Sequence, residues 1–462
     1  MRGAFAIPVL AGLLVQASPA QEASSPDALT LRAAVEIARA GHPAALAAEA
    51  EVLAVSQNVR KAVAEGYLPR LALGAYSGLV PEARGDIFSS PDLQTDLDGL
   101  GVFWRLNLGL IQPITTVGRA GAAVTAARES SVAAAFRRDA ILEQLSVEVV
   151  KAYWGVLAAE EAGRLARESG DRYRELLEEI ENRLARDDSE VDDGDLLEAQ
   201  SHELEIETLI QSSLEKRDLA VRAFNILLDR EAGSSVALVP LDPPGFEAAE
   251  EMGRRMILVA LDESPEVRAL TAAARASEAK VKAIGRKAWP MLYLAGEFGL
   301  ARAPNRQDQT NPFVVDNFNY RNLGLALGLR WEPDLFARPA DVRQAEAEHK
   351  ALIGRLAACR DKVELDAARA FAQARRNARL LEAARRSLAA AKSWLRLSQE
   401  NWDTGFGDAY RLLRAYRSYF ELRSASVERE YELNISLAEL ARVMGDAGRY
   451  LDWVERGKVV LD

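Results

Sequence analysis

Two stretches of the chain keep an apolar period of three to four residues over a length that ordinary globular helices do not reach. Residues 119–184 contain no proline and are rich in Ala, Leu, Glu and Arg, and residues 338–402 have a similar composition. In the first stretch the apolar positions are Leu142, Leu145, Val149, Ala152, Val156 and Ala159. At 1.5 Å per residue such a helix is about 100 Å long and has no compact core of its own. The pattern therefore predicts that each long helix packs along its whole length against neighbouring helices.

The apolar period changes to two in four shorter segments, at about residues 70–80, 101–112, 290–301 and 320–332. One face of each predicted strand carries mainly Leu, Val, Phe and Trp. The candidates for the opposite, water-facing side are Arg105, Asn107, Tyr293, Glu297, Asn322 and Arg330. This alternation is typical of a transmembrane β-barrel with a wet lumen, and equally of an antiparallel sheet half buried in a soluble protein.

The same order of elements occurs twice: a helix, two strands, a long helix, a turn and a returning helix. Pro69 and Pro290 precede the strand pairs 221 residues apart, and Pro113 and Pro333 follow them 220 residues apart. We therefore predict a duplication. The predicted division is a first repeat at 21–229 with its returning helix at 195–229, a linker at 230–263, a second repeat at 264–445 with its returning helix at 408–444, and a C-terminal tail at 446–462.

The N-terminus and the composition narrow the class of protein. Residues 1–20 combine Arg2, an apolar run and small residues before Ala20, which is typical of a secretory signal peptide. No later apolar run is long enough for a transmembrane helix, so any membrane crossing is expected to use strands. The net charge of -11 argues against a nucleic-acid partner.

The residue types that usually build catalytic or metal sites are scarce. The three histidines are scattered without ligand spacing, so neither a metal site nor a cofactor is predicted. The single cysteine, Cys359, excludes an intrachain disulfide, and its apolar neighbours at helical spacing indicate a buried structural thiol. Neither a phosphate-binding loop nor a nucleophile with its base is recognisable, so an enzyme is not expected.

If the strands cross a bilayer, physical constraints require an oligomer. Four strands cannot close a barrel, for which about eight is the practical minimum, and open strand edges are not tolerated in hydrocarbon. Several chains must then share one barrel. A dimer and a trimer both satisfy this argument.

Several motifs resemble the TolC family of outer-membrane efflux and secretion channels. They are EGYLPRLAL before the first strand, LIQPITTVGRAGAAVTAA after the second, AYWGVLAAEE in the long helix, and TGFGDAYRLLRAYRSYFELRSASVEREYELNISLAELARVMG in the last helix. The resemblance implies a mainly α fold with a small β part: an α-helical barrel plus a β-barrel shared between three chains. It also implies a location in the outer membrane of a Gram-negative bacterium, with a large periplasmic part that works with a periplasmic adaptor and an inner-membrane pump. Transport would be passive passage from the periplasm to the exterior, in a tripartite efflux or type I secretion system.

The turns between helices are the candidate gate and docking sites. The acidic first turn is either a solvated turn or a cation-favouring ring at the tunnel mouth. The gate candidates are Asp187, Asp188, Glu190, Asp192, Asp193, Asp195, Glu198, Asp403, Asp408, Arg411 and Arg414. The candidates for adaptor docking are Gly194, Gly405, Phe406 and Gly407.

The start of the second returning helix departs from the family pattern. The first copy has Asp195 and Glu198 around two leucines, as the family often does, whereas the second has Arg411 and Arg414 at the corresponding positions. This exchange leads to the hypothesis that the two acids pair with the two arginines and hold the tip closed. The alternative to a channel is a soluble secreted coiled-coil scaffold or adaptor protein whose sheet packs on itself.

Overall fold

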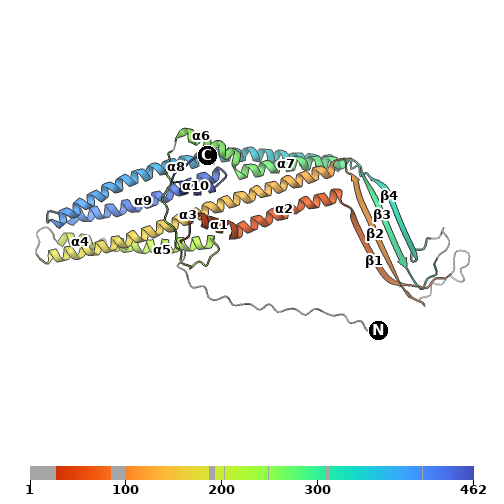
Figure 1. Ribbon diagram of the computed structural model, residues 1–462, viewed down its shortest axis with the longest axis horizontal. Coiled ribbons are helices and arrows are strands. Elements are labelled where there is room, and N and C mark those ends of the chain that lie inside the picture. The colour runs from red at the N-terminus through yellow and green to blue at the C-terminus, as the bar shows by residue number, and fades with distance from the viewer. Residues whose placement is uncertain are drawn as a thin grey trace.

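The computed structural model describes residues 28–84, 99–186, 193–201, 203–247, 249–308, 313, 315–407 and 409–461. The chain is elongated, with paired long helices at one end and a four-stranded sheet at the other (Figure 1). We call the end at which α3 and α8 finish the tip, and the middle of the helical part the equator. The fold is mainly α-helical with a small antiparallel sheet, as the sequence predicts.

The described residues of the first half form five helices. They are α1 (Leu31–Gly41), α2 (Pro43–Tyr67), α3 (Arg119–Leu184), α4 (Asp193–Ser201) and α5 (Glu203–Leu227). Local chemistry explains the break between α1 and α2: Pro43 occupies the first position of α2, and the His42 ring nitrogen accepts a hydrogen bond from the Ala44 N–H at 3.2 Å. The helix α3 follows Gly118, whose φ of 77° is readily adopted by glycine.

The second half supplies the remaining described helices. They are α6 (Glu250–Glu263), α7 (Pro265–Gly285), the short 3-10 helix η1 (Arg286–Ala288), α8 (Ala337–Asp403), α9 (Ala409–Val443) and α10 (Gly448–Arg456). Two of them lie in segments that the sequence assigned differently: α6 in the predicted linker and α10 in the predicted tail. Both are short amphipathic helices, and α10 buries Tyr450, Leu451 and Trp453 against the rest of the chain. Their apolar stripes are too short to distinguish from a loop by period alone.

The sheet joins the two halves. Its strands are β1 (Arg70–Val80), β2 (Gly101–Thr115), β3 (Met291–Arg302) and β4 (Tyr320–Arg330). Neighbouring strands are antiparallel, and the order β1-β2-β3-β4 brings the second strand of the first half beside the first strand of the second half. β1 and β4 are therefore the two edge strands.

The helices form rows with the same lateral order. Near the sheet, α2 contacts α3, α3 contacts α7, and α7 contacts α8. Near the tip, α5 contacts α3, α3 contacts α9, and α9 contacts α8. Each long helix thus packs against two shorter helices that follow one another along its length, α2 and α5 on α3, and α7 and α9 on α8 (Figure 1). Every row begins with an element of the first half and ends with one of the second half.

The main hydrophobic core lies at the equator, where the rows change partners. Val147, Val149 and Leu437 are fully buried there, between α3 and α9. One chain of buried hydrogen bonds crosses this core: the Trp154 indole donates to the Tyr450 hydroxyl at 2.7 Å, and that hydroxyl donates to Asn434 at 2.9 Å. Cys359 packs against this core but is half-buried rather than fully buried as predicted, and this partial burial raises the pKa of its thiol. None of the described helices is both long and apolar enough to cross a membrane.

Candidate functional site

The turn after α8 is built on glycine. The Phe406 N–H donates to the Asn401 carbonyl at 3.0 Å and the Gly405 N–H to the Trp402 carbonyl at 3.1 Å, which is the Schellman pattern of helix termination. Gly405 takes the left-handed conformation that this motif needs, with φ of 76°. A Cβ on Gly407 would lie only 2.5 Å from the Trp402 backbone nitrogen. The turn therefore requires both glycines, and it leaves the Phe406 ring 88% exposed at the tip.

A tryptophan joins the ends of the two long helices. Trp402, near the end of α8, is fully buried among Leu176 and Ile180 of α3 and Leu412 of α9. Its indole N–H donates to the Glu179 carboxylate at 2.7 Å, and the Arg183 guanidinium lies 3.8 Å from the centre of its ring. We call Trp402, Glu179 and Arg183 the tip contact. The sequence interpretation missed it because the partners are more than 200 residues apart along the chain, although a tryptophan in the last turn of a long helix was a visible signal.

Many of the predicted gate residues lie where the structure gives no description. Asp187, Asp188, Glu190, Asp192 and Asp408 fall outside the described residues. Asp193 and Gly194 are exposed at the start of α4, whereas Asp195 and Glu198 lie on α4 with side chains that are not described. Asp403 is exposed at the end of α8 and accepts a hydrogen bond from Gln399 at 2.8 Å.

The two arginines of the predicted latch lie on the first turns of α9, which contacts α4. Both are exposed, and the Arg414 guanidinium is 5.4 Å from the centre of the Tyr410 ring. Their pairing with Asp195 and Glu198 stays a prediction.

A cleft of about 1000 Å³ opens in the tip half. Side chains of α3, α5, α8 and α9 line it, and they combine aromatic rings such as Tyr416 and Phe420 with arginines such as Arg172. Arg172 pairs with Glu175 at 2.7 Å, so one cation of the cleft is already neutralised. The cleft lies between the α3–α5 pair and the α8–α9 pair.

The sheet brings all six predicted water-facing residues to one face. The register pairs Asn107 with Gly299, and Gly299 with Asn322, and it keeps Arg105, Tyr293, Glu297 and Arg330 on the same side. The Tyr320 hydroxyl donates to Asn107 at 3.0 Å, and the Arg105 guanidinium lies 5.7 Å from the Tyr320 ring. Rings on this face lie over glycines of the next strand: a Cβ on Gly328 would meet Tyr293 at 2.5 Å.

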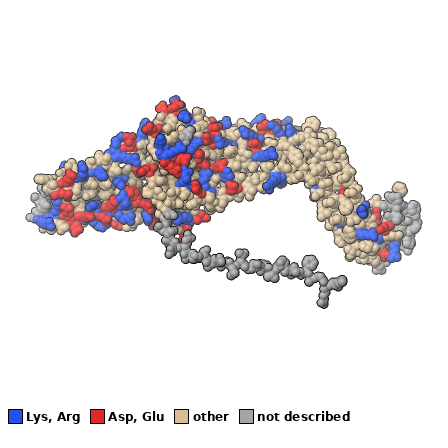
Figure 2. Space-filling model, in the orientation of Figure 1, with Lys and Arg blue, Asp and Glu red and all other residues tan. Residues whose placement is uncertain are grey.

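The opposite face of the sheet is apolar and uncovered. Leu71, Leu73, Leu323, Leu325 and Leu327 are each between 67% and 80% exposed. In the view of Figure 2 the surface of the sheet and the adjoining helix ends is almost without charged side chains, which gather on the rest of the helical part and at the far end of the sheet. An apolar surface of this extent marks a contact with lipid or with another protein.

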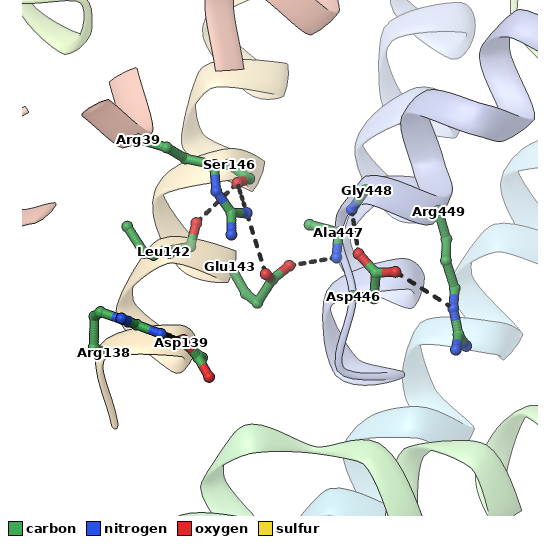
Figure 3. Close-up of polar contacts among 10 residues, drawn as sticks. All are labelled: Arg39, Arg138, Asp139, Leu142, Glu143, Ser146, Asp446, Ala447, Gly448 and Arg449. Carbon is green, nitrogen blue, oxygen red and sulfur yellow. Dashed lines mark hydrogen bonds and ion pairs between the residues drawn. The ribbon is translucent and has the colours of Figure 1, made fainter. Parts of the chain in front are cut away.

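A buried carboxylate fixes the C-terminal helix at the equator (Figure 3). Glu143 of α3 is 7% exposed, and the Arg39 guanidinium of α1 lies 3.2 Å from one of its oxygens. The backbone N–H of Ala447, just before α10, donates to the other oxygen. Burial raises the pKa of Glu143, against the opposing effects of the Ala447 N–H and Arg39. No local pattern indicated the role of Glu143, because both of its partners come from distant segments.

The described residues contain no group of three or more His, Cys, Asp or Glu side chains that could hold a metal ion. The arrangement instead consists of a polar and an apolar face on one sheet, long helices, and a tip at which Trp402 joins α8 to α3. Such an arrangement suits a conduit or an interaction surface.

Comparisons with known proteins agree with this architecture. Protein CyaE of Bordetella pertussis is 27% identical over 434 residues, which cover 92% of this chain and 85% of that protein. The outer membrane protein VceC of Vibrio cholerae has a similar structure, with a TM-score of 0.70, 16% identity, and coverage of 90% of this chain and 96% of VceC. The open state of the MtrE outer membrane channel of Neisseria gonorrhoeae matches with a TM-score of 0.69 and 18% identity over 90% of this chain and 89% of MtrE.

The match to a family covers most of both halves. Residues 34–200 and 256–446 match the outer membrane efflux protein family, and these ranges include the long helices, the sheet and both tip segments. The chain therefore belongs to the outer membrane efflux protein family.

Proposed function

We propose that this protein is the passive exit duct of a tripartite efflux or type I secretion system, spanning the outer membrane and reaching into the periplasm. The observation that carries the proposal is the sheet, which has one exposed apolar face, one polar face and two open edges. A bilayer would cover the apolar face, and water in a lumen would solvate Arg105, Asn107 and Glu297.

The open edges support an oligomer. Edge strands in hydrocarbon must be paired, so β4 of one copy would pair with β1 of the next. Since β1 and β4 run antiparallel to each other, this pairing continues the antiparallel order. Three copies would give a barrel of 12 strands, and a homotrimer is what the resemblance to the TolC family implies. The helical rows, which begin and end with corresponding elements, would close around the same axis into a tunnel.

The tip is the proposed meeting point with the rest of the machine. Phe406 is an almost fully exposed aromatic side chain on a rigid glycine turn, a feature that suits docking of a periplasmic adaptor. An inner-membrane pump would supply the energy and select the cargo, and the duct itself would carry out no chemical step. The MtrE channel has an open state, so we propose that the tip contact and the acidic first turn form a gate that opens and closes.

Fractionation combined with conductance tests the proposal. The protein should be extracted from membranes only by detergent, should migrate as an oligomer that dissociates on heating, and should conduct ions after reconstitution into a planar bilayer. A freely soluble monomer would overturn the proposal and favour the alternative of a secreted scaffold.

A further inference from the structure

The four connections between the helices and the sheet carry an excess of positive charge. The structure describes all of these connections, which are residues 65–70, 111–121, 284–293 and 328–340. The acidic residues are Glu65, Glu332 and Asp334, and the basic residues are Arg70, Arg119, Arg286, Lys287, Arg330 and Arg338. Six basic residues against three acidic ones leave a net charge of +3, whereas the whole chain carries -11. The connections are therefore opposite in sign to the chain that surrounds them.

Two of these arginines lie together on the polar face of the sheet. Arg330, at the end of β4, pairs with Met291 across the sheet, and its guanidinium lies 5.4 Å from the centre of the Tyr293 ring on the same face. Arg119, the first residue of α3, donates to the Met291 sulfur at 3.7 Å. Both guanidinium groups are thus on the polar side, at the level where the sheet meets the helices. We call Arg119 and Arg330 the collar.

A third guanidinium adds to the positive charge at this level. Arg286, just after α7, donates to the Gly118 carbonyl at 2.9 Å, and Gly118 immediately precedes Arg119. The contact brings two cations into neighbouring positions without a carboxylate between them. Such an arrangement raises the positive potential around the collar.

Contacts within the chain do not explain the charge of the collar. Among the described residues, neither Arg119 nor Arg330 pairs with a carboxylate: one donates to a sulfur and the other lies over a ring. An uncharged glutamine is also a hydrogen-bond donor, so donation alone does not require an arginine. The N-terminus of α3 moreover disfavours a positive charge at Arg119. Both charges are therefore available to a mobile anion.

Acidic groups near the collar neutralise only part of it. The four strands, which are described throughout, contain one acidic residue, Glu297. It lies six residues from Met291 along β3, or about 20 Å, which is well beyond the Debye length of about 8 Å at physiological salt. Glu332 follows Arg330 by two residues and offsets one charge, whereas the Asp334 carboxylate accepts the Ala337 N–H at 2.9 Å and caps α8.

We infer that the collar, repeated in every copy of the proposed duct, surrounds the lumen where the tunnel joins the barrel and binds anionic groups of passing solutes. Rings of arginine or lysine are a known means by which pores favour anions and phosphates. The chemical class is a solute that carries carboxylate, phosphate or sulfate groups. This inference rests on the proposed function and adds the class of cargo that the barrel end of the duct favours.

Reversal potentials under a gradient of KCl test the charge of the lumen. The full chain is reconstituted into a planar bilayer of phosphatidylcholine, so that no anionic lipid contributes. Arg119→Gln combined with Arg330→Gln should raise the ratio of potassium to chloride permeability at least twofold. The rise should be seen at about 0.1 M salt, where the Debye length is about 10 Å, and should fade towards about 1 M, where it is about 3 Å.

Matched variants separate the position of the charge from its mere loss. Arg330→Gln alone should shift the reversal potential, whereas Arg321→Gln should not, because Arg321 pairs with Leu300 on the opposite face of the same strand. Arg330→Lys keeps the charge and should leave the permeability ratio unchanged. The reversal potential does not depend on the number of open channels, so poorer assembly of a variant does not imitate the effect.

Inorganic tripolyphosphate serves as the binding probe. Added to the unmodified channel, it should reduce the current in brief steps that become more frequent with concentration. The combined Arg119→Gln and Arg330→Gln variant should need a several-fold higher concentration for the same block, and Arg321→Gln should behave like the unmodified channel. High salt should weaken the block, because it screens the collar.

The outcomes separate this inference from the proposed function. A conducting channel whose permeability ratio and block are the same with and without the collar arginines overturns the collar and leaves the duct standing. An equal shift in Arg321→Gln, or a shift in Arg330→Lys as large as in Arg330→Gln, also overturns it. Absence of conductance in the unmodified protein overturns the proposed function itself.

Discussion

Replacement of Trp402 by alanine should release the tip of the proposed duct. Trp402 joins the end of α8 to α3 by its burial, by its hydrogen bond to Glu179 and by the stacked guanidinium of Arg183. If opening separates the α3–α4 pair from the α8–α9 pair, these contacts stabilise the closed state selectively.

The size of the expected effect on the open probability follows from the burial of the Trp402 side chain. Truncation of a fully buried tryptophan to alanine costs about 3–5 kcal/mol. The hydrogen bond to Glu179 adds about 1 kcal/mol or less, because that carboxylate is 42% exposed. If one third of the total is lost on opening, the ratio of open to closed tips rises about tenfold in each copy, since about 1.4 kcal/mol corresponds to a factor of ten.

Single-channel recording in planar bilayers measures the effect. Trp402→Ala should raise the open probability strongly, and Trp402→Phe, which keeps most of the packing but removes the N–H donor, should raise it less. Trp394→Ala is the matched control: this half-buried tryptophan lies about two turns earlier on α8 and takes no part in the tip contact. An open probability of Trp402→Ala equal to that of the unmodified channel would refute the assignment of the tip contact to the gate.

Three further predictions concern the sheet, the turn and the equator. Leu325→Lys, on the exposed apolar face, should abolish or strongly reduce the heat-sensitive oligomer in membranes, because a lysine facing lipid at mid-depth costs about 2–4 kcal/mol. The control Asn322→Lys, on the polar face, should be tolerated. Equal losses of oligomer in the two variants would contradict the assignment of the two faces. Gly407→Ala forces a Cβ against the Trp402 backbone and should destabilise the tip by about 1–3 kcal/mol, which limited proteolysis would detect as faster cleavage at the tip. The control Gly354→Ala places its Cβ in open space and should not change the rate of cleavage. Burial opposes ionisation of Glu439, but hydrogen bonds from Lys151 and Arg442 outweigh the effect of burial and lower the pKa of this carboxyl group. The Glu439 carboxylate therefore stabilises the fold at any pH above its pKa in the unfolded chain. This contribution is lost as the pH falls through the lower pKa of the folded state. Melting curves of Glu439→Gln should therefore depend less on pH across the acidic range than those of the unmodified protein, and equal dependence would count against the pairing.

The kinds of elements and their order were predictable from the sequence. The spacing of neighbouring apolar residues distinguishes a helix from a strand, and prolines and glycines mark where each element ends. Local patterns were therefore enough to predict the two long helices and the four strands. The same period of two assigned Arg105, Asn107, Tyr293, Glu297, Asn322 and Arg330 to one side of the strands, and the register places all six on one face. Short elements escaped this reasoning: α10 spans nine residues and is held by contacts with other segments rather than by a long pattern.

The contacts between distant segments became known from the packed fold. Trp402 and Glu179 are 223 residues apart, and Glu143 and Ala447 are 304 apart, so no local pattern connects them. The lateral order of the helices also became known only when α3 was seen to contact both α7 and α9. That order puts α5 and α8 at opposite edges of the row. The physical reason is that spacing along a chain specifies one face of one element, whereas a contact between distant segments depends on which faces the completed packing brings together.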